Sequence, residues 1–230
     1  QPAVVPGHSL GEFSALVAAG ALTLADAQPL VRFRAQAMQE AVPVGAGGMA
    51  AILGLDAQAV RDGCAEAAGA AGEVVEAVNF NDPKQIVIAG TKAAVEKACE
   101  VLKAKGAKRA LLLSVSAPFH SSLMKPAADR LKERLAATAI TTPVIPVINN
   151  IDVAVQTDPA AIRDALYRQA FGPVRWVETV QAIRARGILH VIECGPGKVL
   201  AGMVKRIEAD ATGAPLFDPA SLAEAKGMLS

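Results

Sequence analysis

The sequence predicts an α/β protein in which a core built on a parallel sheet is interrupted by an inserted sub-domain. Before residue 49 and after residue 115, apolar runs of strand length alternate with segments of helical periodicity, a pattern typical of parallel sheets. Between these positions the order becomes strand, helix, strand, strand, helix, strand, the βαββαβ order of ferredoxin-like domains. We therefore expect a core of residues 1–48 and 116–230 and a ferredoxin-like sub-domain of residues 49–115.

Composition narrows the class of protein. A chain of 230 residues with 52% hydrophobic content can bury a sizeable core. The formal net charge of +1 gives no basic field, so nucleic acid is not an expected partner. No apolar run is long enough to cross a membrane, so no membrane association is expected. Three scattered cysteines form neither a disulfide framework nor a metal-ligand pattern, which favours a cytoplasmic location.

The first part of the core predicts a strand, a tight turn and two helices. The apolar run 3–6 precedes Gly-His-Ser-Leu-Gly-Glu at residues 7–12, and a helical segment follows at 13–19. Residues 23–26 resemble a capping box, and helical spacing then continues to about residue 41. Pro29 is compatible with this helix only near its first turn, because proline lacks a backbone N–H.

Glycine and proline mark the ends of the remaining elements. Residues 43–48 read as a linker. In the sub-domain we expect strands at 49–54, 74–80, 85–90 and 108–115, a turn at 81–83, and helices at 56–69 and 92–105. In the second part of the core we expect a loop at 116–121, helices at 122–138, 159–170, 174–186 and 198–209, and strands at 144–149 and 188–193.

The turn at residues 7–12 carries the pattern Gly-x-Ser-x-Gly between a strand and a helix. Two glycines, which lack Cβ, allow a sharp turn that exposes the hydroxyl of Ser9 at the end of a sheet. The helix that follows can stabilise negative charge as this serine reacts. The backbone N–H of Leu10 is the expected oxyanion donor. This strand-turn-helix order, typical of α/β-hydrolases, makes Ser9 the candidate nucleophile and the core α/β-hydrolase-like.

The choice of a base is narrow because the chain has only three histidines. His8 adjoins the nucleophile, so its side chain is expected to point away from Ser9. His190 lies in an apolar strand and reads as a structural histidine. His120 lies in a loop after a strand, where catalytic residues of α/β folds collect, and is therefore the expected base. No third acid stands out: Asp152, Glu178 and Glu193 all remain open on position alone.

Arg34 is expected on the apolar stripe of its helix, with Leu30, Ala37 and Met38. A guanidinium facing a core is costly unless an anion meets it. Spacing alone leaves two interpretations open: a structural ion pair or snorkelling side chain, and a receptor for an anionic substrate.

Four segments resemble malonyl-CoA:acyl carrier protein transacylases and the related acyltransferase domains of polyketide synthases. They are Gly-His-Ser-Leu-Gly-Glu at 7–12, the Arg34 helix with Met-Gln-Glu-Ala-Val-Pro at 38–43, Ser-Ala-Pro-Phe-His-Ser at 116–121, and Gly-Pro-Gly-Lys-Val-Leu at 195–200. The resemblance covers nearly the whole chain, and the four segments together are highly specific.

The resemblance implies a role for each candidate residue. It implies that His120 is oriented by the backbone carbonyl of a glutamine that matches Gln169, and that Arg34 binds the free carboxylate of the substrate. Phe119 resembles the residue that favours malonyl over methyl-branched units by filling space near Cα. For the side chain of Gln169, a position on the surface of a helix remains an open alternative.

The resemblance also implies a ping-pong reaction. Malonyl-CoA acylates Ser9, and the phosphopantetheine thiol of acyl carrier protein then takes the malonyl group for fatty-acid elongation. No cofactor is implied, since malonyl-CoA is a substrate. The Gly-Gln-Gly motif that supplies this family's second oxyanion donor does not occur in the sequence. We expect a preceding segment to carry it.

Two further hypotheses remain open. A serine esterase or thioesterase would share the Ser9 turn but would release the acyl group to water, and it would have no need of an inward-facing Arg34. A truncated fragment with an inert Ser9 would bind a carrier protein without forming an acyl-enzyme.

Overall fold

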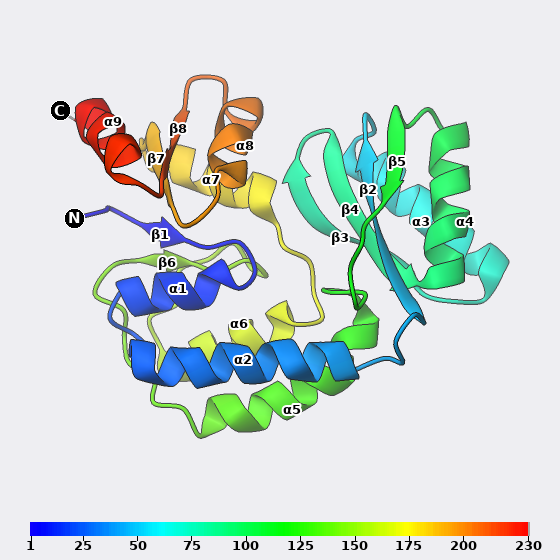
Figure 1. Ribbon diagram of the computed structural model, residues 1–230, viewed down its shortest axis with the longest axis horizontal. Coiled ribbons are helices and arrows are strands. Elements are labelled where there is room, and N and C mark those ends of the chain that lie inside the picture. The colour runs from blue at the N-terminus through cyan, green and yellow to red at the C-terminus, as the bar shows by residue number, and fades with distance from the viewer. Residues whose placement is uncertain (230) are drawn as a thin grey trace. The chain divides into compact units, whose positions relative to one another are not determined.

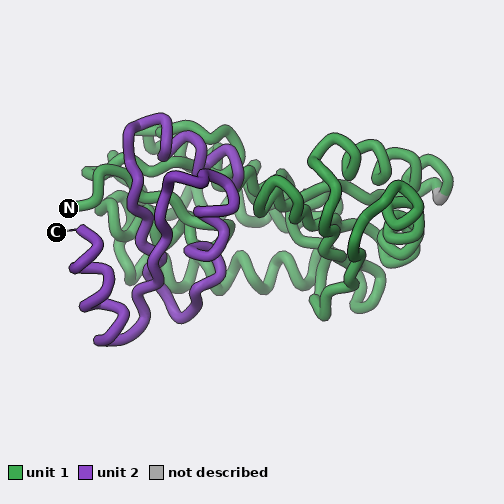
Figure 2. The backbone as a smooth tube through the Cα atoms, turned by 90° about the horizontal axis from the view of Figure 1, so that it is seen from above, with its two compact units in different colours: residues 1–176 green, residues 177–230 purple. Residues whose placement is uncertain are grey.

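The computed structural model describes residues 1–229, which divide into two compact units (Figure 2). The first unit spans residues 1–176 and the second begins at residue 177. Parallel and antiparallel strands are both present, which confirms the prediction of a mixed α/β protein. Within residues 1–229, no helix combines the length and the hydropathy that a membrane span requires.

The elements of the first unit follow the expected order (Figure 1). They are β1 (Val5–Pro6), α1 (Gly11–Ala18), α2 (Leu24–Glu40), β2 (Gly47–Leu53), α3 (Ala57–Ala71), β3 (Val75–Asp82), β4 (Gln85–Thr91), α4 (Lys92–Ala104), β5 (Arg109–Leu112), the short 3-10 helix η1 (Ser122–Met124), α5 (Lys125–Ala136), β6 (Val147–Ile148) and α6 (Pro159–Gln169). Helix α7 (Trp176–Arg184) begins at the last residue of this unit.

Residues 47–112 contain a four-stranded antiparallel sheet in the order β3-β4-β2-β5. Helices α3 and α4 cover one face of it (Figure 1). Strand β2 begins at Gly47, inside the stretch expected to be a linker. The reason is close packing, because a Cβ on Gly47 would lie 2.3 Å from Cδ of Pro118. Gly47 therefore allows close approach in a strand instead of a flexible connection.

Helices α2, α5 and α6 lie side by side below the nucleophile turn (Figure 1). Their apolar faces join those of α1 and β6 in the main core of the unit, which includes Phe13, Leu16, Leu30, Leu131, Leu135, Val147 and Leu166. Helix α2 begins where expected, because the side chain of Thr23 accepts a hydrogen bond from the backbone N–H of Asp26. Pro29 was expected in the first turn but lies in the second, where one backbone donor is lost.

The parallel strands form two separate pairs instead of the single sheet that the alternating pattern predicts. Strand β1 pairs with β6 in the first unit, and each contributes only two residues. Strand β7 (His190–Cys194) pairs with β8 (Thr212–Leu216) in the second unit.

The second unit also contains α8 (Val199–Ile207) and α9 (Pro219–Leu229). Neither β8 nor α9 was expected. For β8 the reason is that Gly213 and Pro215 argue against a strand. Gly213 is needed there, since a Cβ on it would lie 2.3 Å from the carbonyl oxygen of Ala201. His190 was expected to be a structural histidine in an apolar strand, but the strand is not buried around it. Its strand has only β8 as a partner in the described chain, and the side chain is exposed.

Candidate active site

Ser9 lies in the turn between β1 and α1, with a positive backbone φ of 53°. A non-glycine residue adopts this conformation only at a cost, and such strain concentrates at functional sites. The two glycines of the motif have different roles. A Cβ on Gly7 would lie 1.9 Å from the backbone carbon of Gly11, whereas a Cβ on Gly11 would meet nothing within 4 Å. Only Gly7 is therefore required by contact with the rest of the turn.

We expect Gly7→Ala to lower the free energy of unfolding by about 3 kcal/mol or more, because the backbone of α1 would have to move away from β1. The matched variant Gly11→Ala should keep wild-type stability or gain up to about 1 kcal/mol, because alanine is the better helix former. Urea unfolding of both variants checks this. Equal losses in the two variants would contradict it.

The hydroxyl of Ser9 contacts His120, as predicted: Oγ of Ser9 lies 2.7 Å from Nε2 of His120. The other ring nitrogen, Nδ1, lies 2.9 Å from the backbone carbonyl oxygen of Gln169. A carbonyl only accepts, so Nδ1 carries the proton and a neutral ring leaves Nε2 free to accept the Ser9 proton. The ring is thus oriented as a base by a carbonyl group.

His120 is presented by the loop that leaves β5, with a positive φ of 66°. The hydroxyl of Ser121 donates to the carbonyl oxygen of Pro118 at 2.7 Å, which closes this loop on itself. The neighbouring side chain of Phe119 packs against buried residues of the four-stranded sheet, among them Met49 and Val87. Both reacting residues therefore sit in left-handed turns that the surrounding packing holds in place.

Arg34 is buried on α2 and points to Ser9. Its Nη2 donates to Oγ of Ser9 at 3.0 Å and to Oε1 of Gln169 at 3.1 Å, and the guanidinium lies over the ring of Phe13. Its Nε is buried without a hydrogen-bond partner among the described residues. Burial lowers the pKa of Arg34 to about 10, so it remains charged at neutral pH. A buried cation with an unused donor beside the Ser9 hydroxyl has the chemistry to bind an anion.

Gln169 is fully buried at the end of α6, so the alternative of a surface glutamine is wrong. Its side-chain Nε2 donates to the carbonyl oxygen of Ser9 at 3.0 Å and to Oε2 of Glu12 at 2.9 Å. The residue therefore contacts the site twice, through its backbone carbonyl at His120 and through its side chain at Arg34.

Two residues of the site were not singled out by sequence. Glu12 is buried in the first turn of α1, and burial raises its pKa to about 7. Asn150 follows β6, accepts a hydrogen bond from the backbone N–H of Ser9 at 2.7 Å and donates to the carbonyl oxygen of Gly7 at 2.6 Å. Two features of the sequence could have pointed to these residues. Glu12 is a carboxylate directly after the Gly-x-Ser-x-Gly motif, and Asn150 stands at the carboxyl end of the strand predicted at 144–149.

Three of the other candidates, Asp152, Glu193 and His8, are hydrogen-bonded to partners of their own. Asp152 forms a two-pronged ion pair with Arg168 at 2.7 Å, and Glu193 accepts from the backbone N–H of Ala201. His8 points away from Ser9, as expected, and hydrogen-bonds Oδ1 of Asn81 at 2.9 Å. No group of three or more side chains suited to a metal ion occurs in the described part of the chain.

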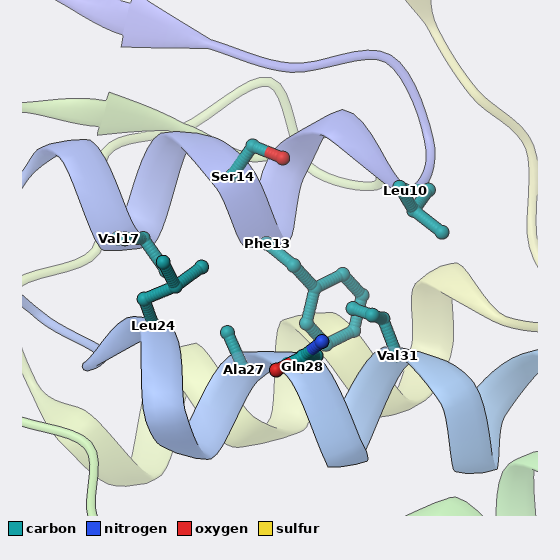
Figure 3. Close-up of a pocket in the computed structure, with 8 residues that line it drawn as sticks. All are labelled: Leu10, Phe13, Ser14, Val17, Leu24, Ala27, Gln28 and Val31. Carbon is teal, nitrogen blue, oxygen red and sulfur yellow. The ribbon is translucent and has the colours of Figure 1, made fainter.

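A groove of about 350 Å³ runs between α1 and α2 (Figure 3). Leu10, the residue after the nucleophile, lies at one end of it (Figure 3). Its lining contains no charged side chain and consists of Leu10, Phe13, Ser14, Val17, Leu24, Ala27, Gln28 and Val31. The groove therefore offers no charged partner to an anionic group.

A serine hydroxyl that is hydrogen-bonded to a neutral imidazole can take up an acyl group, and an adjacent guanidinium favours acyl groups that carry negative charge. The site thus defines a serine-dependent acyl-transfer protein. Comparison with known families narrows this class: the acyl transferase domain matches residues 1–216, and the chain belongs to this family.

Three similar proteins that carry a name are all named as malonyltransferases that act on acyl carrier protein. The chain is 54% identical to the malonyl CoA-acyl carrier protein transacylase of Salmonella typhimurium over 97% of its own length and 72% of the relative's. It is 70% identical to an acyl-carrier-protein S-malonyltransferase of Burkholderia pseudomallei, with a TM-score of 0.95 over 98% of this chain and 73% of the other. A malonyl-transacylase solved in complex with a polyketide acyl-carrier protein matches at 49% identity and a TM-score of 0.95, over 98% of this chain and 72% of that one.

Proposed function

We propose that this protein is a malonyl-CoA:acyl carrier protein transacylase that supplies malonyl groups for fatty-acid elongation through a malonyl-Ser9 ester. One observation carries the proposal beyond family membership. The Oγ of Ser9 is hydrogen-bonded both to a histidine base and to a buried arginine with an unused donor. An esterase needs the first contact but has no use for the second.

In the first half-reaction, Nε2 of His120 takes the Ser9 proton while Oγ attacks the thioester carbonyl carbon of malonyl-CoA. The negative charge that develops on the carbonyl oxygen is stabilised by the N-terminus of α1, with the backbone N–H of Leu10 as donor. Collapse of the tetrahedral intermediate breaks the carbon–sulfur bond, and the CoA sulfur leaves with the proton held by His120. The product is malonyl-O-Ser9.

In the second half-reaction, the phosphopantetheine thiol of acyl carrier protein gives its proton to His120 and attacks the ester carbonyl. The carbon–oxygen bond breaks, Ser9 recovers its proton, and malonyl-carrier protein leaves. No cofactor enters either step. Throughout, Arg34 binds the free malonyl carboxylate, with a fork geometry that a lysine cannot reproduce. Phe119 limits space near the malonyl Cα, a distinction worth about 1–3 kcal/mol.

The rate of the first step should not depend on titration of His120 between pH 5 and 8. Burial and the charge of Arg34 lower the pKa of His120 to about 3, so the ring remains a neutral base as the pH falls. Burial raises the pKa of Glu12 to about 7, inside this range, so the profile is to be measured on the unaltered chain and on Glu12→Gln. A loss of rate centred near pH 6.5 in both proteins would contradict the prediction.

The test of the proposed function is intact-mass detection of an acyl adduct after mixing with malonyl-CoA, with Ser9→Ala as control. We expect one malonyl adduct per chain, its absence in the control, and its transfer to holo-acyl carrier protein. Free malonate without carrier acylation would support the esterase instead. Absence of any adduct on the folded chain would support an inert carrier-binding fragment.

We also infer a finer architecture: an α/β-hydrolase-like core of residues 1–48 and 116–230 with a ferredoxin-like sub-domain of residues 49–115. The order β3-β4-β2-β5 and the sequence of elements βαββαβ support the sub-domain. The strand-turn-helix position of Ser9 supports the core. We infer a cytoplasmic location as well, and the three unpaired cysteines agree with a reducing compartment.

A further inference from the structure

Glu12 is a buried carboxyl group for which the reaction has no use. It is 2% exposed and lies in the first turn of α1. One of its oxygens, Oε2, accepts from the backbone N–H of Asn150 at 2.8 Å and from Nε2 of Gln169 at 2.9 Å. A carboxyl group removed from water is costly, and here it is held by two donors that both belong to the active site.

We propose that Glu12 is a positioning residue that fixes the orientation of the Gln169 amide and thereby holds Arg34 in place for a carboxylate-bearing acyl group. The inference rests on the proposed function, because it concerns the binding of the malonyl carboxylate. It adds a residue that touches neither the substrate nor the reacting atoms.

The argument starts from the two different ends of the Gln169 amide. Its Nε2 faces acceptors only, the carboxylate of Glu12 and the carbonyl oxygen of Ser9, and its Oε1 faces a donor, Nη2 of Arg34. The reversed amide would place an oxygen against two acceptors and an NH₂ group against a guanidinium. Since the carboxylate of Glu12 cannot donate when ionised, it excludes this reversed orientation.

The orientation of the Gln169 amide matters for Arg34 because Gln169 keeps its hydrogen bond to Arg34 throughout the reaction. The Nη2 of Arg34 is held by two acceptors, Oγ of Ser9 and Oε1 of Gln169. Once Ser9 carries an acyl group, its hydroxyl no longer serves in the same way, and Oε1 of Gln169 is what keeps the guanidinium aimed at the site. A reversed amide would repel Arg34 at the stage when the malonyl carboxylate must be bound.

When it is ionised, Glu12 also carries a negative charge that favours the charged form of Arg34. Glu12 raises the pKa of Arg34 against the effect of burial, and Arg34 in turn lowers that of Glu12. The two groups are linked through the Gln169 amide. The hydrogen bonds set the orientation of the Gln169 amide, and the charge of an ionised Glu12 adds little to an arginine that is already charged at neutral pH.

The experiment compares the rates at which malonyl-CoA and acetyl-CoA acylate Ser9, measured by intact mass. Glu12→Leu should lower the malonyl-to-acetyl ratio about tenfold or more, because a hydrogen bond to a charged group is lost. Glu12→Gln should keep the ratio within about threefold, because its side-chain oxygen can still accept from both donors. Rescue by glutamine is expected only if orientation of the amide is what matters.

A second variant keeps the test decisive if Glu12→Leu folds poorly. Gln169→Met removes the side-chain amide but keeps the backbone carbonyl that orients His120. Gln169→Met should lower the malonyl-to-acetyl ratio as much as Glu12→Leu does. The variant that combines both changes should lower the ratio no further, since each change removes the same Glu12–Gln169 interaction. Asn150→Ala, which loosens the Ser9 turn, serves as the control for a purely structural effect and should slow both acylations alike.

The outcomes separate the two proposals. Equal losses for malonyl-CoA and acetyl-CoA in Glu12→Leu, or additive losses in the double variant, would overturn the role of Glu12 and leave the proposed function intact. Absence of any malonyl adduct on the unaltered chain would overturn the proposed function and the role of Glu12 with it.

Discussion

Replacing His120 with alanine is expected to slow formation of the malonyl-Ser9 ester by about 10²- to 10⁴-fold, the range typical of a general base. The Ser9 hydroxyl has one acceptor suited to its proton, the unprotonated Nε2 of His120 at 2.7 Å. Arg34, its other partner, can only donate. Without the imidazole, the proton would have to pass to water as the serine attacks.

The time course of the acyl adduct measures this loss directly. His190→Ala is the matched control, because that histidine is exposed on β7 and is expected to leave the rate unchanged. Circular dichroism of both variants verifies that each remains folded. A rate within tenfold of the unaltered chain in His120→Ala would remove His120 from the role of base.

Replacing Arg34 with alanine is expected to lower malonyl transfer by about 10²-fold or more relative to acetyl transfer. The estimate reflects the cost of removing one partner of a buried charge pair. The malonyl carboxylate would meet a buried site without its cation, whereas the uncharged acetyl group loses only packing. Arg34→Lys should recover little of the loss, because an ammonium cannot match two carboxylate oxygens in a plane.

Arg32→Ala provides the comparison on the same helix, since Arg32 is exposed and outside the site. Competition between malonyl-CoA and acetyl-CoA for one sample of protein gives the ratio without errors in concentration. If Arg34→Ala slowed malonyl and acetyl transfer equally, the arginine would support the structure of the site and would not bind the malonyl carboxylate.

Sequence patterns predicted the structure correctly where the contacts that determine it join residues close together in the chain. Thr23 caps α2 through a residue three positions away, and the βαββαβ order follows from the periodicity of each element. The Gly-x-Ser-x-Gly motif predicted the turn at Ser9, although only Gly7 proves necessary for it. Strand β8 was missed because Gly213 and Pro215 have poor strand propensity, and a tertiary contact with α8 overrides it.

The sequence by itself predicted the turn at Ser9, the candidate nucleophile, the pairing of Ser9 with His120 among three histidines, and the inward direction of Arg34 on its helix. Each follows from residue type and spacing within one segment. Only the tertiary structure decided that Glu12 and Asn150 complete the site and that the Gln169 amide faces Arg34, whereas the family resemblance had already implied the contact of His120 with the Gln169 carbonyl. The physical reason is that hydrogen bonds between groups 49 to 157 residues apart depend on distances and angles that spacing along the chain does not encode.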